Sequence, residues 1–286
     1  MQIVSAPSEL RELLQRHQLR NEKVGFVPTM GALHKGHFKL IQRAAAENDL
    51  SVVSIFVNPI QFNDKKDYAN YPVDLDQDIK HLASQDVDYV FTPTEAQLYP
   101  RKPTISISFG KLADMMEGKF RKGHFEGVGV VVSKLMNIVN PSRAYFGLKD
   151  LQQYLLIKLM CHELNFPTEI IGVETVREQS GLALSSRNRR LSKDGIEIAS
   201  SLYKGLKLIA ERIGGSFSLN EAIGEVNDYY SSVKGLEVEY LEVIDPDSLE
   251  LIESLGERNE LAICVAGYVE GIRLIDNLYL RLKTAG

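Results

Sequence analysis

Cysteine is scarce in this sequence: only Cys161 and Cys264 are present, roughly a hundred residues apart and without a Cys-x-x-Cys motif. Disulfide frameworks and structural zinc sites both need several cysteines at suitable spacing. Neither is therefore expected, and we expect both thiols to pack as small apolar side chains. A reducing, cytoplasmic location suits such a chain.

Long apolar runs are also lacking, since none approaches the roughly 18–20 residues that a membrane-spanning helix requires. The first residues, MQIVSAPSELRELL, place acidic side chains and a proline where a signal peptide has its apolar core. No fixed-period repeat or low-complexity tract occurs. The sequence therefore predicts neither membrane association nor export.

An excess of positive charge is missing as well: 33 basic residues against 38 acidic ones give a net charge of -5. Proteins that coat nucleic acids are usually basic, so we expect no nucleic-acid partner, although a local basic pocket for a small anion remains open. The length of 286 residues corresponds to two domains at roughly 150 residues each.

The first part of the sequence shows patterns typical of strands that alternate with patterns typical of helices. Strands are predicted at 24–27, 51–57, 87–91, 143–146 and 169–173, and helices at 37–47, 74–85, 126–139 and 150–164. Asp74 is predicted to cap the second of these helices. Such alternation indicates right-handed βαβ units and a parallel sheet covered on both faces. We therefore predict an α/β protein with a Rossmann-like nucleotide-binding domain over residues 1–175.

The pattern changes after about residue 175. Helices are predicted at 192–212 and 219–232, followed by strands at 238–244, 261–269 and 272–280. Between the last two strands, Glu270 and Gly271 indicate a tight hairpin. Residues 176–286 are therefore predicted to form a smaller α+β domain, with the boundary between 174 and 190.

The turn after the first predicted strand, PTMGALHKGH, contains His34 and His37 together with Gly31 and Gly36. Turns at this edge of a parallel sheet commonly bind phosphates. Neither GxGxxG nor GxxxxGK[ST] occurs, which excludes the dinucleotide and P-loop motifs. Imidazole N–H groups can instead stabilise a phosphate that gains charge. A chance pair or a zinc site remains an alternative, although HxxH without a third ligand is poor zinc evidence.

Two further segments carry polar groups suited to phosphates. YFGLKD supplies Lys149 and Asp150 at a predicted strand end, and LSSRN supplies Ser185, Ser186 and Arg187 near the domain junction. Lysine and arginine neutralise phosphate charge, and an aspartate can hold Mg²⁺. The alternatives are a solvated Lys-Asp pair and a polar cap before the helix at 192.

VPTMGALHKGH resembles the HxGH signature of the nucleotidylyltransferase superfamily, and its flanks are similar to the pantothenate synthetase family. The other matching blocks, in the family's order, are FVNPIQF, YP at 71–72, GHFEGV, YFGLKDLQQ, REQSGLALSSRN and RLIDN. The resemblance covers residues 25–191 and extends more weakly to the C-terminal strands.

The resemblance implies an ATP-dependent, Mg²⁺-assisted condensation of pantoate with β-alanine. Pantoate would attack the α-phosphorus of ATP to give pantoyl adenylate and pyrophosphate, and the amine of β-alanine would then release AMP and form pantothenate. The family also implies a homodimer, with residues 176–286 acting as a lid. The alternatives are another nucleotidylyltransferase and a non-catalytic nucleotide-binding regulator.

By the same resemblance, His34, His37, Lys149 and Arg187 are the predicted catalytic residues, with His37 as the proton donor. Asp150 is the predicted metal ligand, and Gln61 and Gln153 are predicted to bind pantoate or β-alanine. The predicted ATP site comprises Met30, Gly31, Ala32, Leu33, His34, Lys35, Gly36, His37, Gly147, Leu148, Lys149, Asp150, Val176, Leu184, Ser185, Ser186 and Arg187. Weaker candidates are Asn58, Tyr71, Glu117, Arg121 and His124, the last three in a predicted loop, either a flap or a solvated loop.

The sequence departs from the family's usual pattern at Val73, at Lys122 and at Gln179-Ser180. None of these positions lies in the three main segments. The departures therefore bear on loop rigidity and on a local salt bridge more than on the reaction.

Overall fold

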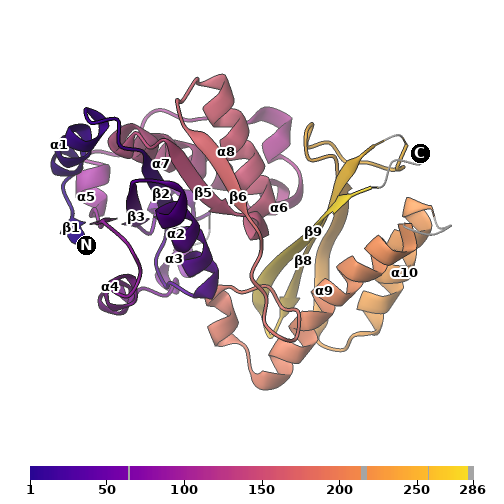
Figure 1. The fold of residues 1–286 in the computed structure, drawn as a ribbon. Coiled ribbons are helices and arrows are strands. Elements are labelled where there is room, and N and C mark those ends of the chain that lie inside the picture. Colours follow the sequence, from indigo (N-terminus) through magenta and orange to yellow (C-terminus); the bar gives the residue numbers. More distant parts are fainter. Residues whose placement is uncertain (64, 214–217, 257, 283–286) are drawn as a thin grey trace. The chain divides into compact units, whose positions relative to one another are not determined.

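The computed structural model describes residues 1–63, 65–213, 218–256 and 258–282. The chain forms two compact units (Figure 1), each described by itself below. Unit 1 comprises Met1–Leu148 and Gln153–Glu174, and unit 2 comprises Lys149–Gln152 and Thr175–Gly286. The assignment of ATP and pantoate binding to residues 1–175, and of a lid to 176–286, stays a prediction.

Unit 1 is built on a six-stranded sheet in the order β1-β4-β3-β2-β5-β6, and every neighbouring pair is parallel. The strands are β1 (Gln2–Val4), β2 (Val24–Thr29), β3 (Leu50–Ile55), β4 (Tyr89–Phe91), β5 (Arg143–Gly147) and β6 (Glu169–Val173). Five of these were predicted from the sequence, β3 from a β-branched run that is apolar on both faces. The sixth, β1, is too short to give a pattern and is held by pairing with β4.

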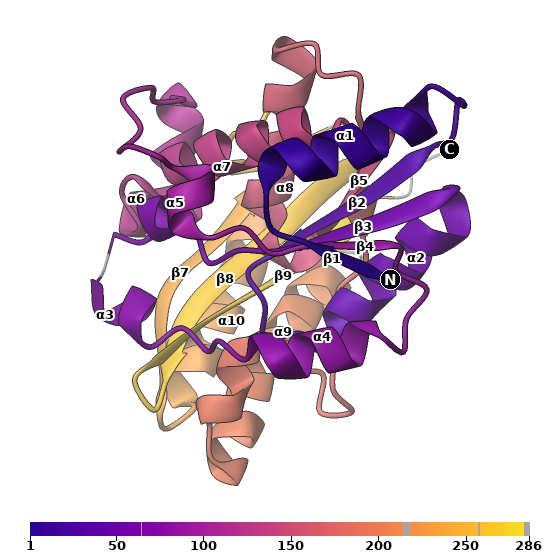
Figure 2. The same cartoon turned by 90° about the vertical axis from the view of Figure 1, so that its left-hand side faces the viewer.

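Helices cover both faces of this sheet, as predicted (Figure 2). α1 (Pro7–Gln18), α7 (His124–Val139) and α8 (Leu151–Glu163) lie on one face, and α2 (Lys35–Glu47) and α4 (Leu75–Leu82) lie on the other. Adjacent strand residues point to opposite faces. Phe26 accordingly joins the core cluster under α1 and α7, whereas Val27 joins the cluster under α2.

Shorter elements connect the strands: α3 (Lys65–Ala69), α5 (Glu95–Leu98), α6 (Met116–Phe120) and the 3₁₀ turns η1 (Pro59–Gln61), η2 (Gly110–Ala113) and η3 (Leu148–Asp150). Asp74 caps α4, as predicted, because its side chain accepts a hydrogen bond from the Gln77 N–H at 3.0 Å. α7 begins two residues before its predicted start at 126, because Gly123 takes the left-handed conformation, with φ of 81°, that ends the preceding turn.

β2 and β5 are neighbours in the sheet, but the chain proceeds from them towards opposite edges: from β2 to β3 and β4 on one side, and from β5 to β6 on the other. The helices that follow them, α2 and α8, lie on opposite faces. In open parallel sheets, ligands bind in the crevice at the carboxyl ends of strands where the connections diverge in this way. The turn after β2 and the end of β5 therefore lie where a Rossmann-like fold holds its ligand.

Unit 2 contains a three-stranded antiparallel sheet in the order β7-β8-β9, with two helices that share its core cluster. Its elements are η4 (Ser186–Arg190), α9 (Lys193–Ile213), α10 (Leu219–Ser232), β7 (Leu236–Ile244), β8 (Glu260–Val269) and β9 (Ile272–Arg281). The predicted hairpin is present: Glu270 and Gly271 form a two-residue turn with φ of 53° and 72°. The predicted α/β class with a smaller α+β part is thus confirmed.

Both cysteines are buried and form no disulfide, as expected. Burial raises the pKa of the Cys161 thiol to about 11, so this side chain stays protonated and apolar in character. Among the described residues, no helix is both long and apolar enough to cross a membrane.

Candidate active site

The turn between β2 and α2 holds the two histidines of the HxGH motif. The chain reverses through Gly31 and Ala32, whose φ angles are 82° and 51°. The buried carboxylate of Asp78, from α4, accepts hydrogen bonds from the Ala32 and Leu33 N–H groups, both at 2.8 Å. A Cβ atom at position 31 would lie 2.9 Å from Asp78 Oδ2. Asp78 therefore shapes the turn, and glycine is required beside it.

The imidazoles of His34 and His37 form the N-terminal cap of α2. His34 Nδ1 accepts from the Gly36 N–H at 3.1 Å, and His37 Nδ1 accepts from the His34 N–H at 3.3 Å. Because both Nδ1 atoms accept, this network assigns the proton of each ring to Nε2. The ring centroids are 4.1 Å apart. Two Nε2–H donors thus lie side by side at a helix N-terminus, where anions are favoured.

A zinc ion was the alternative for this pair. Across the described parts of the chain, no group of three or more His, Cys, Asp or Glu side chains could hold a metal ion. The histidine pair therefore lacks the further protein ligands of a structural or catalytic zinc site.

Gln61 is only 5% exposed and lies beside the same turn. Its Nε2 atom donates to Met30 Sδ at 3.0 Å, and its Oε1 atom accepts from Asn58 Nδ2 at 3.0 Å. The Tyr99 hydroxyl donates to Asn58 Oδ1 at 2.9 Å, and burial raises the pKa of Tyr99, which keeps that proton in place. The structure thus brings Met30 and Gln61 together and fixes the orientation of the Gln61 amide.

Three of the weaker candidates form a chain of polar contacts that ends at the Gln61 main chain. His124 Nδ1 donates to the Gln61 carbonyl oxygen at 2.9 Å, while Arg121 donates to His124 Nε2 at 3.1 Å. Glu117 lies 3.8 Å from the Arg121 guanidinium. The predicted loop at 117–126 is therefore wrong for most of its length. Residues 117–120 belong to α6 and residues 124–126 to the first turn of α7, a turn at 121–123 joins them, and Glu117 and His124 are buried.

Tyr71, the fifth weak candidate, packs against Phe62 with ring centroids 5.8 Å apart. Asn58, by contrast, is buried and also donates to the Gly127 carbonyl at 3.2 Å. α7 approaches η1 so closely that a Cβ atom at Gly127 would lie 2.4 Å from the Ile60 carbonyl oxygen. Tyr99 and Gly127 were missed by sequence reasoning because their contacts are made with residues far away in the chain.

At the end of β5, Gly147 pairs with Val173, and Gln153 lies half-buried in the first turn of α8. Lys149 and Asp150 belong to unit 2, with Lys149 Nζ 3.9 Å from Asp150 Oδ1. The Asp150 side chain is 51% exposed. Mg²⁺ is usually bound by one or two carboxylates together with substrate phosphates and water, so a single accessible carboxylate fits that ion.

The LSSRN segment lies in unit 2 at the end of a narrow hairpin. The Leu184 N–H donates to the Val176 carbonyl at 2.9 Å, which pairs two predicted ATP-site residues. Ser185 caps η4 by accepting from the Arg187 N–H at 3.3 Å. The predicted capping role is therefore real, but it serves η4 rather than the helix near 192.

The four residues that depart from the family's usual pattern, Val73, Lys122, Gln179 and Ser180, are all exposed. The Ser180 hydroxyl accepts from the Leu182 N–H at 3.4 Å and so stabilises the hairpin turn. None of the four belongs to the histidine turn or to the residues that hold Gln61.

Comparison with known proteins decides the family. The model of the family described as pantoate-beta-alanine ligase matches residues 2–279. The chain belongs to this family. It is therefore a ligase that makes pantothenate from pantoate and β-alanine, and the predicted alternatives of another nucleotidylyltransferase or a binding regulator are set aside.

Relatives match along their whole length. The ligase is 45% identical over 280 residues to the pantothenate synthetase of Cytophaga hutchinsonii, covering 98% of this chain and 99% of the relative. The crystal structure of the Thermus thermophilus pantothenate synthetase matches with a TM-score of 0.91 and 42% identity, covering 97% and 99% of the two chains.

A third relative carries ligands. The pantoate-beta-alanine ligase of Francisella tularensis, described as complexed with beta-gamma ATP and β-alanine, matches with a TM-score of 0.79 and 39% identity, covering 97% of each chain.

Proposed function

We propose that the ligase works in two steps through pantoyl adenylate. A pantoate carboxylate oxygen attacks the α-phosphorus of ATP, and the bond to pyrophosphate breaks. The amine of β-alanine then attacks the acyl carbon, and AMP leaves. A carboxylate is a poor acyl donor because its leaving group would be oxide, so activation must come first. The ATP compound and β-alanine bound to the Francisella relative support the use of these two substrates.

The paired imidazoles carry the proposal. They occupy the N-cap and N3 positions of α2, so their Nε2–H groups lie at the sheet edge where phosphates bind. We assign both His34 and His37 to stabilising the charge that develops on the phosphates, which accelerates the reaction because that charge is larger in the transition state. His37 is assigned to protonating the leaving pyrophosphate.

The residues of unit 2 are assigned to the remaining phosphate charge. Lys149 and Arg187 supply cations, and the hydroxyls of Ser185 and Ser186 hold the β- and γ-phosphates. Asp150 is the carboxylate that would hold Mg²⁺, which supplies further charge neutralisation when bound. Positioning and electrostatics then account for catalysis without a covalent nucleophile on the enzyme.

Gln61 and Gln153 are assigned to the acid substrate. The Gln61 Oε1 atom accepts a hydrogen bond from Asn58, so the Gln61 NH₂ group faces Met30 and the histidine turn. An NH₂ group there can donate to the carboxylate or a hydroxyl of pantoate. The buried Asn58–Tyr99 pair keeps this orientation without rearrangement during binding.

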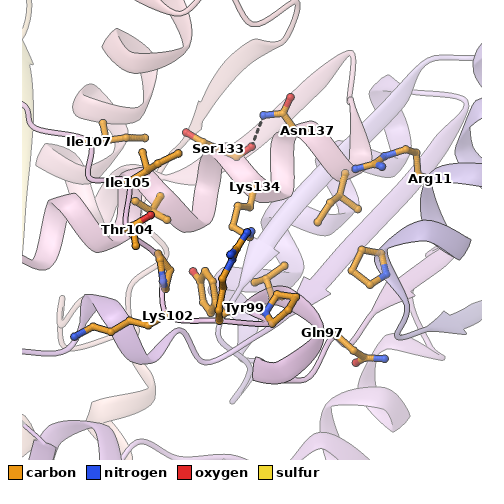
Figure 3. Close-up of a pocket in the computed structure, with 17 residues that line it drawn as sticks. Arg11, Gln97, Tyr99, Lys102, Thr104, Ile105, Ile107, Ser133, Lys134 and Asn137 are labelled. Atoms are coloured by element: carbon orange, nitrogen blue, oxygen red, sulfur yellow. Dashed lines mark hydrogen bonds between the residues drawn. The ribbon is translucent and has the colours of Figure 1, made fainter.

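We also propose a homodimer formed through unit 1. Residues 104–109, TISISF, alternate polar and apolar side chains like a strand, yet they pair with no strand in the described part of unit 1. Ile105 is 77% exposed and lines a cavity of about 740 Å³ together with Ile107 (Figure 3). Unpaired strand-like segments readily pair with a second copy of the same chain.

The decisive experiment is pantoate-dependent exchange between ATP and labelled pyrophosphate. His37→Asn keeps an acceptor near the Nδ1 position that caps the His34 N–H but removes the Nε2–H donor. We expect exchange to fall by about 100-fold or more with the melting temperature unchanged. His37→Gln, which restores an amide near Nε2, should recover part of the rate.

Near-wild-type exchange in His37→Asn would show that the role given to His37 is wrong. Product analysis with the substrates offered singly tests the order of the steps, because AMP formed without pantoate contradicts adenylation of pantoate.

A further inference from the structure

Two adjacent polar residues are buried in β9, an otherwise largely apolar strand of unit 2. Asp276 is 4% exposed and Asn277 is 7% exposed. Burying a carboxylate and an amide is costly unless both are fully hydrogen-bonded, so their partners indicate why they are there. Sequence reasoning noted RLIDN only as a matching block.

Asp276 holds the hairpin that leads into the LSSRN segment. Arg177 donates to both carboxylate oxygens of Asp276, at 2.6 and 2.9 Å, and also to the carbonyls of Gly181 and Asn277. The guanidinium lies 3.7 Å from the ring centre of Tyr203, on α9. Residues 177–183 are thereby attached to β9 by a planar, bidentate ion pair, an arrangement that fixes both distance and orientation.

Asn277 holds the other phosphate-binding segment of unit 2. Its Nδ2 atom donates to the Lys149 carbonyl oxygen at 2.8 Å. Burial raises the pKa of the Asp276 carboxyl, whereas the positive charges of Arg177 and Lys149 lower it. The Lys149 ammonium therefore lies within the electrostatic reach of Asp276, and its main chain is bonded to the next residue along the strand.

We infer that Asp276 and Asn277 are positioning residues for the adenylation step, which set Lys149 and Ser185–Arg187 at the spacing needed to meet the phosphates of one ATP. The inference rests on the proposed function of those segments. Each segment is part of a short 3₁₀ turn, η3 or η4, and the two are far apart in sequence, so neither fixes the position of the other. Their common attachment to two neighbouring residues of a paired strand supplies the rigidity that preorganised catalysis requires.

The test is a double-mutant cycle on Asn277 and Lys149, measured by pantoate-dependent exchange. Asn277→Ala removes the donor to the Lys149 carbonyl but leaves the Arg177–Asp276 ion pair intact. We expect kcat for exchange to fall by about 10- to 100-fold, as for a misplacement of catalytic groups by about 1 Å. The KM for pantoate should change little, because the Gln61 pocket belongs to unit 1.

The energetic coupling between Asn277 and Lys149 distinguishes a positioning role from a purely structural one. If Asn277 acts through Lys149, then Lys149→Met/Asn277→Ala should be no slower than Lys149→Met alone. Asn277→Ser keeps a hydrogen-bond donor on a shorter side chain, so its exchange rate should lie between those of wild type and Asn277→Ala. If Asn277→Ala does not fold, Asn277→Ser replaces it in the double-mutant cycle. Arg281→Gln, on the same strand with an 85% exposed side chain, is the matched control and should match wild type.

Two outcomes would overturn the inference: wild-type exchange in Asn277→Ala while Lys149→Met is impaired, or strictly multiplicative losses in the double variant. Wild-type exchange in Lys149→Met would instead refute the proposed role of Lys149 itself, and with it the need to position that residue.

Discussion

The orientation of His34 and His37 depends on backbone N–H groups, and the course of that backbone depends on one residue, Asp78. Its two carboxylate oxygens each accept a main-chain N–H from the turn before the histidines. A buried carboxylate with both oxygens bonded is strongly directional. Asp78 therefore supports the turn that carries the histidine pair, although it lies on a different helix.

Asp78→Asn tests this support. The new amide accepts one N–H but presents its NH₂ group to the other, which leaves a buried donor unsatisfied at a cost of about 1–3 kcal/mol. We expect a lower melting temperature together with a loss of pantoate-dependent exchange of about 10-fold or more.

The matched control is Asp74→Ala on the same helix. It removes the N-terminal cap of α4 and should cost about 1 kcal/mol. Its exchange rate should stay near wild type. Equal losses of activity in both variants would show that α4 acts on the site only through its stability.

The sequence indicated the two histidines and, as weaker candidates, four of the residues that support Gln61, but it did not indicate the support that Asp78 gives. His34 and His37 lie together in one motif, and the structure pairs their rings. Asp78 lies 46 residues from its partner Ala32, and its only local signal is its position four residues before the buried Leu82 on an amphipathic helix. Such a position predicts burial but does not identify the partner.

At the scale of elements, the β8–β9 hairpin shows how local chemistry specifies a turn. Glu270 and Gly271 both have positive φ, as in a type I′ turn, whose twist matches that of paired strands. The Glu270 carboxylate also accepts from the Ser192 N–H at 2.9 Å, just before α9 begins. The turn therefore organises a helix start as well as two strands.

Glycine-to-alanine substitutions should have opposite effects in two elements of unit 2. Gly271→Ala meets no neighbouring atom but must adopt φ of 72°, which costs about 1–2 kcal/mol. Gly224→Ala, in the exposed interior of α10, also meets no atom and should stabilise by about 0.5–1 kcal/mol. Thermal melting of both variants checks the signs, and a shift in the same direction for both would contradict this account.

Most helices and strands could be predicted from the sequence because the spacing of apolar residues can be recognised within a short segment. The helix at 219–232 and the strand at 169–173 match the predicted bounds. The helices α1, α3 and α5 were not predicted. Two further elements that were not predicted have tertiary causes: β1 exists through its pairing with β4, and α6 approaches η2 so closely at Gly118 that a Cβ atom there would lie 1.9 Å from the Ala113 carbonyl oxygen. Neither cause is visible in a short window of sequence.

For the whole molecule, a division into two parts was predicted from the length and from the change of pattern near residue 175, and the chain forms two compact units. The assignment of Lys149–Gln152 to unit 2 could not be predicted, because these residues lie within the strand–helix alternation that predicts the first domain. One contact that joins them to unit 2 is the hydrogen bond from Asn277, on β9, to the Lys149 carbonyl oxygen, which no local pattern encodes.

The oligomeric state is the prediction that belongs to this scale. Ile105→Lys places a charge on the exposed strand-like segment and should convert the proposed dimer to a monomer in sedimentation velocity. Val73→Lys, at an equally accessible apolar position of unit 1 outside that segment, should remain dimeric. A wild-type monomer, or a dimer in both variants, would contradict the proposed interface.

The hydrogen bond between Asn277 and Lys149 spans 128 residues of sequence. A ribosome adds roughly 5–20 residues per second, so about 6–26 s separate the synthesis of its two ends. During that interval the growing chain already carries the histidine turn and Gln61, but it lacks Asn277, the donor to the Lys149 carbonyl oxygen. On the positioning role inferred for Asn277, the order of translation delays the proposed adenylation step until the last strand has been made.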